Sequence, residues 1–299
     1  MVGSILKTPA SLAWRRTTPI LYSLRQALDE HRWLGFSIWT FALCSLSQRY
    51  GQAFLRWVLL RHPRRVLQGL LAYRRFLAQE SRWGELVPIG VANAEVLWMT
   101  AAEAGPRFLV GLGFCQKPGD LGGRGPACPS GRFNHDCHYL EQLDADRPTA
   151  GLQNLACQQC TIRILGAAAL HAGASLYIMT TALEIAEDFL LPALTENHFV
   201  AALLTLCPYS AKPIALPLLI CGLKAGIATY DQGACLDYDH WLRADRGDKP
   251  ERTSLPSEVL GKVLEGLEGV AEGRRGGRHF RRQPILWPGT GGNVYVPSL

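Results

Sequence analysis

Eight of the nine cysteines in this 299-residue chain lie between residues 115 and 235. They are Cys115, Cys128, Cys137, Cys157, Cys160, Cys207, Cys221 and Cys235. Thiolates bind zinc and iron–sulfur clusters. The other use of so many cysteines, a disulfide framework, suits small secreted domains. Residues 1–20 lack the order of charged, apolar and small residues typical of a secretory signal, so we expect a cytoplasmic chain whose thiols bind a metal.

The most specific pattern is Cys157-Gln-Gln-Cys160, which stands directly before a predicted helix over residues 161–172. Two thiols at this spacing can bind one face of a metal ion or cluster, and the amides at a helix start favour the thiolate. Thioredoxin-like dithiols share the spacing but follow a hydrophobic strand, which residues 151–155 do not form. The pattern therefore favours a metal site.

The spacing of the other cysteines favours iron–sulfur over zinc. Structural zinc sites usually combine two close pairs, whereas here 12, 8 and 19 residues separate the first four cysteines. Cubane clusters accept such irregular spacing. We therefore predict one [4Fe–4S] cluster, with zinc as the alternative, bound by four of five cysteines: Cys115, Cys128, Cys137, Cys157 and Cys160.

Other candidate ligands are less strongly indicated. Cys207 and Cys235 are predicted to complete this site or to hold a second cofactor. Cys221 fits a core position and a ligand role equally well. Cys44 fits a structural position inside a buried apolar helix. His135 and His138 flank Cys137, where a histidine can replace a thiolate or donate to a cluster sulfur. The simpler interpretation is that His135 and His138 make ordinary hydrogen bonds in a loop. His171 is predicted to end a helix and not to bind the metal.

Strand and helix patterns alternate along the middle of the chain. We predict strands over 107–115, 175–181, 199–207 and 226–231, helices over 161–172 and 183–195, and irregular structure over 208–223 because of its prolines. This alternation predicts an α/β fold with a parallel, Rossmann-like sheet. Ligands collect at the carboxyl ends of such strands, so Cys115, Cys207 and Cys235 should meet at one edge.

With 48% apolar and 19% charged residues, the chain should be globular. We divide it into a basic helical module (1–80), a cysteine-rich α/β metal-binding domain (81–253), and a C-terminal helix with a basic tail (254–299). Residues 1–80 carry twelve Lys and Arg against three Asp and Glu.

Helices are predicted over 21–32, 33–48, 53–61 and 65–78. The uncharged stretch 33–47 is shorter than the roughly 20 residues needed to cross a bilayer. The last of these helices places arginines beside an apolar stripe, which is typical of a helix on an anionic membrane. A solvated arginine face is the alternative. We therefore expect peripheral association with the inner face of the membrane, or an acidic protein partner, and no nucleic acid.

The order of these features resembles the domain of unknown function 116 family of bacterial and archaeal proteins. The resemblance covers residues 107–238 and rests on a strand ending in Cys115, Cys157-x-x-Cys160 before a helix, a strand ending in Cys207, and Gly233-Ala-Cys235. It implies a hydrophobic N-terminal section before an α/β domain that binds iron–sulfur. The chain departs from the family at Phe114, where histidine is usual, and at Cys221.

Two functional classes follow. The first is an iron–sulfur protein with a redox, sulfur-transfer or cofactor-handling role and an electron-transfer partner. The second is a zinc-stapled, non-catalytic protein that binds a partner or a membrane. Paired carboxylates, a nucleophile elbow and a dinucleotide-type glycine loop are absent from the sequence, so hydrolase and nicotinamide chemistry have no support.

Overall fold

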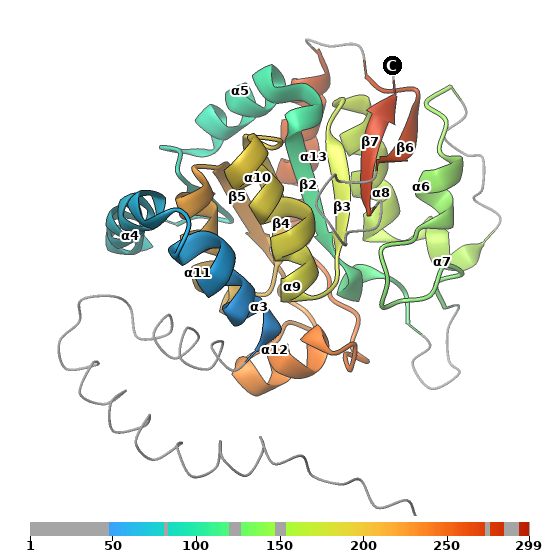
Figure 1. The fold of residues 1–299 in the computed structure, drawn as a ribbon. Coiled ribbons are helices and arrows are strands. Elements are labelled where there is room, and N and C mark those ends of the chain that lie inside the picture. The colour runs from blue at the N-terminus through green and yellow to red at the C-terminus, as the bar shows by residue number, and fades with distance from the viewer. Residues whose placement is uncertain are drawn as a thin grey trace, which may run out of the picture. The chain divides into compact units, whose positions relative to one another are not determined.

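The computed structural model describes residues 48–80, 83–119, 127–146, 154–272, 276–283 and 293–298. Its internal contacts divide the chain into two units, Met1–Gln52 and Ala53–Leu299. In the second unit, the described strands form one sheet with helices on both faces (Figure 1).

The sheet contains seven described strands in the order β1-β5-β4-β2-β3-β7-β6. Their bounds are β1 Leu86–Ile89, β2 Phe108–Gly113, β3 Ser175–Met179, β4 Ala201–Leu206, β5 Lys224–Thr229, β6 His279–Gln283 and β7 Val294–Ser298. The four central strands β5, β4, β2 and β3 run parallel. Strands β1 and β7 pair antiparallel with β5 and β3, and β6 pairs antiparallel with β7. The predicted α/β fold with a parallel, Rossmann-like centre is confirmed.

Helices of the second unit cover the sheet in two layers, because a parallel sheet buries both faces. The described helices of this unit are α4 Pro63–Ala78, α5 Ala94–Ala104, α6 His138–Gln142, α7 Leu155–Gln158, α8 Thr161–His171, α9 Ala182–Ile185, α10 Leu191–Glu196, α11 Pro208–Cys221, α12 Tyr238–Asp245 and α13 Ser257–Glu272. Helix α3, Arg49–Ala53, lies at the boundary between the two units. In Figure 1, α9, α10 and α11 lie in front of the sheet, and α8 and α13 lie behind it. Helix α4 packs on α11, and α13 packs on α5 and α8.

Several predicted elements are confirmed within one or two residues of their ends. The strands over 107–115, 175–181, 199–207 and 226–231 correspond to β2, β3, β4 and β5, and the helices over 161–172 and 65–78 correspond to α8 and α4. The helix predicted over 183–195 is α9 and α10 joined by the π-helical turn Ala186–Leu190. The segment 53–61 contains another π-helical turn, Phe54–Leu59.

The prediction of irregular structure for 208–223 is wrong, since these residues form α11. Pro208 occupies the first turn, where its missing amide hydrogen costs nothing. Pro213 and Pro217 lie inside the helix and remove hydrogen bonds, each at a cost of about 3 kcal/mol. Packing of α11 against β5, α4 and α10 offsets that cost.

The edge strands were not predicted. Strand β1 contains Pro88, which has no amide hydrogen. An edge strand tolerates proline because the amides on its outer side have no neighbouring strand to bond to. Strand β6 falls in the predicted basic tail, and the charges there are used internally: Arg282 pairs with Asp136 and Glu141, and Arg278 pairs with Asp146.

The predicted helices over 21–32 and 33–48, and Cys44, lie outside the described residues. Among the residues that the structure does describe, no helix is both long enough and apolar enough to cross a membrane.

The contact between α5 and α13 generates a stability prediction. A Cβ at Gly266 of α13 would lie 2.2 Å from Cε2 of Trp98 in α5, whereas a Cβ at Gly269 would meet nothing within 4 Å. We expect Gly266→Ala to lower the free energy of unfolding by about 1–3 kcal/mol, because the indole must move. Gly269→Ala should raise it by up to about 1 kcal/mol. Urea denaturation measures both, and equal effects would contradict this packing.

Candidate metal centre

Four cysteines from two stretches of the chain line one small cavity: Cys128, Cys137, Cys157 and Cys160. Cys128 and Cys137 lie in the segment between β2 and α6, Cys157 lies in α7, and Cys160 is the N-cap residue of α8. A thiolate at Cys128 would act electrostatically on each of the other three. We refer to these residues as the four-thiol group.

Two helices begin at this group. Cys160 is the N-cap residue of α8 and Cys137 is that of α6, and neither side chain makes a cap hydrogen bond. The amides of Leu140, Ile162 and Arg163 in these first turns act against the rise that burial causes in the pKa of Cys137 and Cys160. These are amides that an isolated helix leaves without partners. The helix predicted to begin at Thr161 therefore does place its N-terminus at Cys160, as the sequence pattern indicated.

A buried lysine organises the loop that carries two of the four thiols. Lys117 is 1% exposed. Its Nζ donates to the carbonyl oxygens of Gly131, Asn134 and Asp136 at 3.2, 2.8 and 2.7 Å, and to Asn134 Oδ1 at 2.6 Å. Gly131 has φ +76°, which favours glycine. The ammonium group thus folds residues 131–136 around itself and so fixes Cys128 and Cys137 on either side of this loop.

None of the groups that accept a hydrogen bond from Lys117 Nζ is a buried carboxylate. All four of its acceptors are neutral, and the carboxylate of Asp136 is half exposed and pairs with Arg282. Burial lowers the pKa of Lys117, while thiolates at Cys128 and Cys137, the carboxylate of Asp136 and a thiolate at Cys160 raise it again. A buried charge is costly without an opposite charge nearby. Anionic sulfur in the cavity would add to the opposite charge that the exposed Asp136 carboxylate supplies.

Burial favours the neutral thiols when no metal is bound. It raises the pKa of Cys137 to about 12, and it raises the pKa of Cys157 and of Cys160. Metal binding would release these protons, because only the thiolate is a ligand.

A second set of thiols gathers at the carboxyl ends of three neighbouring strands. Cys115 follows β2 in the turn Phe114–Gln116, Cys207 follows β4 as the N-cap of α11, and Cys235 follows β5. The strand order β5-β4-β2 places these ends side by side. We refer to Cys115, Cys207 and Cys235 as the three-thiol group.

Polar groups contact this second set directly. The amide of Cys235 donates to Cys207 Sγ at 3.1 Å, and Thr253 Oγ1 donates to Cys115 Sγ at 3.1 Å. Burial raises the pKa of Cys115. The hydrogen bond between the thiols of Cys207 and Cys235 raises the pKa of Cys207 and lowers that of Cys235, which Lys249 lowers further.

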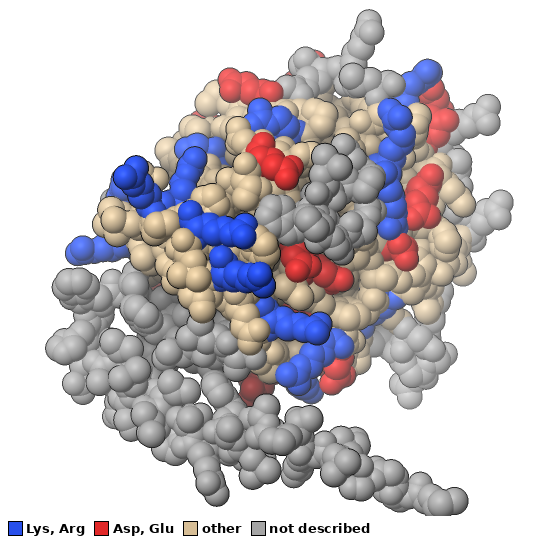
Figure 2. Space-filling model, in the orientation of Figure 1, with Lys and Arg blue, Asp and Glu red and all other residues tan. Residues whose placement is uncertain are grey.

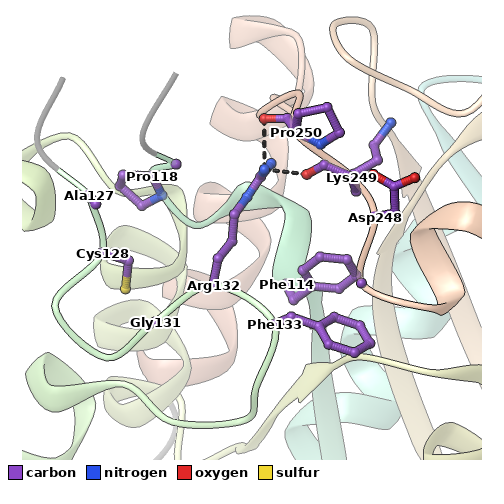
Figure 3. A pocket seen from close by; sticks show the side chains of 12 residues that line it. Phe114, Pro118, Ala127, Cys128, Gly131, Arg132, Phe133, Asp248, Lys249 and Pro250 are labelled. Carbon is purple, nitrogen blue, oxygen red and sulfur yellow. Dashed lines mark hydrogen bonds between the residues drawn. The ribbon is translucent and has the colours of Figure 1, made fainter. Parts of the chain in front are cut away.

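Arg132 links the two groups. Its guanidinium donates to the carbonyl oxygen of Cys115 at 3.2 Å and to that of Pro250 at 2.7 Å, and also to those of Lys249 and Glu251. This holds residues 249–253 beside the three-thiol group. A pocket of about 380 Å³ lies here, lined by Cys128, Phe114 and Lys249 among others (Figure 3).

The structure places the predicted ligands in two groups. Of the five cysteines predicted to contain the four ligands of one cluster, Cys128, Cys137, Cys157 and Cys160 form the four-thiol group. Cys115 is the one left over, and it lies with Cys207 and Cys235 at the sheet edge where the strand ends predicted it. Their role as ligands stays a prediction. Cys221 is the last residue of α11, which begins at Cys207. A helix of 14 residues is about 21 Å long, so Cys221 is remote from both groups, and its Sγ donates to the carbonyl of Leu190 at 3.3 Å.

The candidate histidines lie away from the thiols. His135 Nδ1 is 2.7 Å from the carbonyl oxygen of Ile178, its Nε2 is 3.5 Å from Glu184 Oε1, and its ring stacks on Tyr177. His138 is exposed beside Glu141, and His171 ends α8. The simpler interpretation, ordinary loop contacts, describes His135 and His138.

Lys117, Arg132, Lys249 and Thr253 were missed from the sequence. Lys117 stands two residues after Cys115, a position that could have drawn attention. Lys249 and Thr253 lie in a polar stretch without periodicity, and nothing in it indicates a return to the cysteines.

Among the described residues, no three or more His, Cys, Asp or Glu side chains are spaced to hold a single metal ion. No protein-family model, curated protein or solved structure matches the chain. The resemblance to the domain of unknown function 116 family stays a prediction, and the functional inference rests on the two thiol groups.

The contact between His135 and Glu184 predicts a pH effect on stability. The hydrogen bond with His135 is the main cause that lowers the pKa of Glu184 from 4.5 to about 2. Its stabilisation is therefore complete above about pH 4.5 and lost as the pH falls toward 2. We expect Glu184→Gln to cost about 1 kcal/mol at pH 5, since the carboxylate is 40% exposed, and nothing near pH 2.

Urea denaturation of wild type and variant across pH 2–5 measures this difference. Glu268→Gln, on the exposed side of α13, is the control and should show no pH-dependent difference. A cost for Glu184→Gln that stays constant with pH would assign the effect to packing.

Proposed function

We propose that the protein is an iron–sulfur protein in which Cys128, Cys137, Cys157 and Cys160 hold a [4Fe–4S] cluster. The observation that carries this proposal is the buried ammonium of Lys117 beside four buried or half-buried thiols. Four thiolates around a cluster give it a net negative charge, and one cation together with helix amides offsets part of that charge.

The arrangement of the donors supports a cluster over a single ion. Zinc holds each sulfur about 2.3 Å from the metal, so its four ligands crowd together. A cubane binds one thiolate at each of four separate irons and accepts ligands that approach from several loops. The four-thiol group comes from two stretches of the chain, with Cys128 and Cys137 nine residues apart on the first and Cys157 and Cys160 on the second, which suits a cluster that accepts irregular spacing.

The role that fits four protein thiolates best is electron transfer, because every iron then has a protein ligand. The cluster would supply a one-electron couple when bound, and Lys117 and the amides at Cys137 and Cys160 would stabilise its reduced form. Cys128 is half-buried and also lines the 380 Å³ pocket. A redox partner or a sulfur-transfer substrate would approach on that side.

Zinc is the second candidate, since the close pair Cys157 and Cys160 also matches half of a four-cysteine zinc site. In that case the metal would be structural, and the protein would act by binding a partner.

Metal analysis of anaerobically purified protein separates these candidates. We expect an absorption band near 400 nm that dithionite bleaches, and a loss of about four irons and four sulfides per chain in the double variant Cys137→Ser/Cys160→Ser. Cys221→Ser, at the last residue of α11 and outside both thiol groups, should lose none. Colourless protein with stoichiometric zinc would exclude the iron–sulfur proposal.

We further propose that α4 and the turn before it bind an anionic membrane surface. One side of α4 is buried on α11 through Val66, Tyr73 and Phe76. The opposite side exposes large apolar residues among its arginines, namely Leu60, Leu67 and Leu71 at 70%, 61% and 54%. Figure 2 shows Lys and Arg gathered on the side of the molecule where α4 lies.

Such a surface combines the two forces that hold peripheral proteins. Exposed leucines can enter the headgroup region, while arginines bind anionic lipids. The guanidinium of Arg61 lies 3.9 Å from the ring centroid of Trp57, so an aromatic residue is also present at this surface. Each basic residue near an anionic bilayer contributes about 1 kcal/mol. A location at the inner face of a membrane is therefore our proposal, and point variants can test it.

We expect full-length protein to sediment with anionic vesicles at low salt and to remain in solution at high salt. Arg74→Glu/Arg75→Glu should weaken this binding at least tenfold, since two favourable charges become unfavourable. Arg243→Glu/Arg246→Glu on α12 changes the net charge equally and should have a small effect. Equal losses in both variants would show that net charge alone, and not the α4 surface, drives binding.

A further inference from the structure

Two thiols of the three-thiol group lie in direct contact, and the function proposed above does not use them. Cys207 and Cys235 are 7% and 3% exposed, and a hydrogen bond joins their side chains. The backbone amide of Cys235 also donates to Cys207 Sγ at 3.1 Å. Both cysteines are free in this structure. Two free thiols in contact need only a small movement to form a disulfide.

The backbone around these two cysteines holds them together. Cys207 follows β4 directly, and β4 pairs in parallel with its neighbour β5. Beyond β5, residues 231–232 exchange backbone hydrogen bonds with Ser254. The chain then bends at Gly233, where the φ of +62° favours glycine. This bend returns Cys235 to Cys207, so the contact between the two thiols is a property of the fold.

A buried cation lies near Cys235. The side chain of Lys249 is fully buried, and its Nζ donates to the carbonyl oxygen of Gly233 at 2.5 Å. The hydrogen bond with Cys207, followed by the charges of Lys249 and His240, lowers the pKa of Cys235 to about 6 against the effect of burial. The same hydrogen bond, together with burial, raises the pKa of Cys207. Because thiolates react with oxidants and thiols do not, Cys235 is the reactive member of the pair.

Polar side chains connect this pair to the surface. Lys249 Nζ lies 3.1 Å from His240 Nε2, and these two atoms lie 3.8 and 3.7 Å from Glu251 Oε2, whose side chain is half exposed. Leu236, the residue after Cys235, is an exposed apolar residue. The thiols therefore lie directly beneath the surface, where a molecule as small as hydrogen peroxide can reach them and a disulfide on another protein cannot.

We propose that Cys207 and Cys235 are a redox-active dithiol that reduces small hydroperoxides and closes to an intramolecular disulfide. This role replaces the ligand role that the sequence predicted for the two cysteines. It goes beyond the proposed function, and the two proposals stand or fall separately, because the proposed metal site contains neither cysteine.

The reaction is a two-electron oxidation of the pair in two steps. The Cys235 thiolate attacks one peroxide oxygen, so that an S–O bond forms, the O–O bond breaks, and the released hydroxide takes up the proton that Cys235 has lost. The Cys207 thiol then attacks the sulfenic sulfur. The S–S bond forms, the S–O bond breaks, and the hydroxyl leaves as water with the proton of Cys207. Hydrogen peroxide is thereby reduced to two waters, and a small dithiol returns the pair to thiols by exchange.

Hydrogen peroxide is the probe that tests this pair. Reduced full-length protein is treated with about one equivalent of peroxide per chain, its free thiols are alkylated in denaturant, and cross-linked peptides are identified by mass spectrometry. We expect a disulfide between Cys207 and Cys235 that dithiothreitol removes, in about tenfold excess over oxidised Cys115 or Cys221. Cys115 is the matched control, because it is a buried thiol of the same group. Equal oxidation of Cys115 would overturn the proposal, since peroxide would then react with any buried thiol.

The same measurement on Cys137→Ser/Cys160→Ser separates this inference from the proposed function. That variant lacks the proposed cluster, which can itself consume peroxide, and it keeps both thiols of the pair. A disulfide between Cys207 and Cys235 in either protein supports the dithiol, and its absence from both overturns it, whatever iron content the two proteins have.

The order of the two steps is tested by trapping the sulfenic acid with dimedone. In Cys207→Ser the second step is blocked, so we expect a dimedone adduct on Cys235 after peroxide treatment. In Cys235→Ser we expect no adduct on Cys207. Circular dichroism shows whether each variant keeps its helical signal, and the disulfide in wild type needs no substitution. An adduct on Cys207 in folded Cys235→Ser, with none on Cys235 in folded Cys207→Ser, would overturn the assignment of Cys235 as the attacking thiol.

Discussion

The parallel pairing of β2 with β4 on one side and β3 on the other is the constraint on which both thiol groups depend. Because the strands run in one direction, whatever follows each of them emerges at the same edge of the sheet. Cys115 and Cys207 are fixed there by strand ends alone. The segment after β2 must then fold back over this edge, and Lys117, at the start of that segment, holds it in place.

A buried cation, Lys117, and a half-buried one, Arg132, tie the loops to the sheet, and both bind mainly carbonyl oxygens. Lys117 gathers residues 131–136, and Arg132 joins that loop to residues 249–251. Carbonyl groups compensate a buried cation only in part. The carboxylates of Asp136 and Glu251 supply some of the opposite charge from the exposed side, and thiolates would supply more from the cavity. The electrostatics of the loops are therefore compatible with the proposed metal site.

Periodicity predicted the four central strands and, through their ends, the meeting of Cys115, Cys207 and Cys235, but it could not predict which cysteines of the following loop join Cys157 and Cys160. Buried strands such as β2 and β4 form short apolar runs whose ends can be located, and Cys160 before α8 was recognisable because helix starts have a local signature. Cys115 and Cys128 lie in different thiol groups because the chain folds around Lys117 between them. That fold is a tertiary contact, and it leaves no periodic pattern in the sequence. The error at α11 has the same origin, since packing against α4 and β5 outweighed the local preference of its prolines.

The two thiol groups lie on different kinds of structure, which indicates the sequence in which they form. Cys115 and Cys207 lie at the ends of strands in the most buried part of the sheet, so their positions form as the core forms. Cys128 and Cys137 lie in a loop whose folding requires a buried ammonium among neutral acceptors. That loop gains more of its opposite charge when thiols become thiolates, and burial resists this step until a metal is present. If the proposed metal site is correct, folding of the sheet precedes metal binding at the four-thiol group, and metal binding completes the loop.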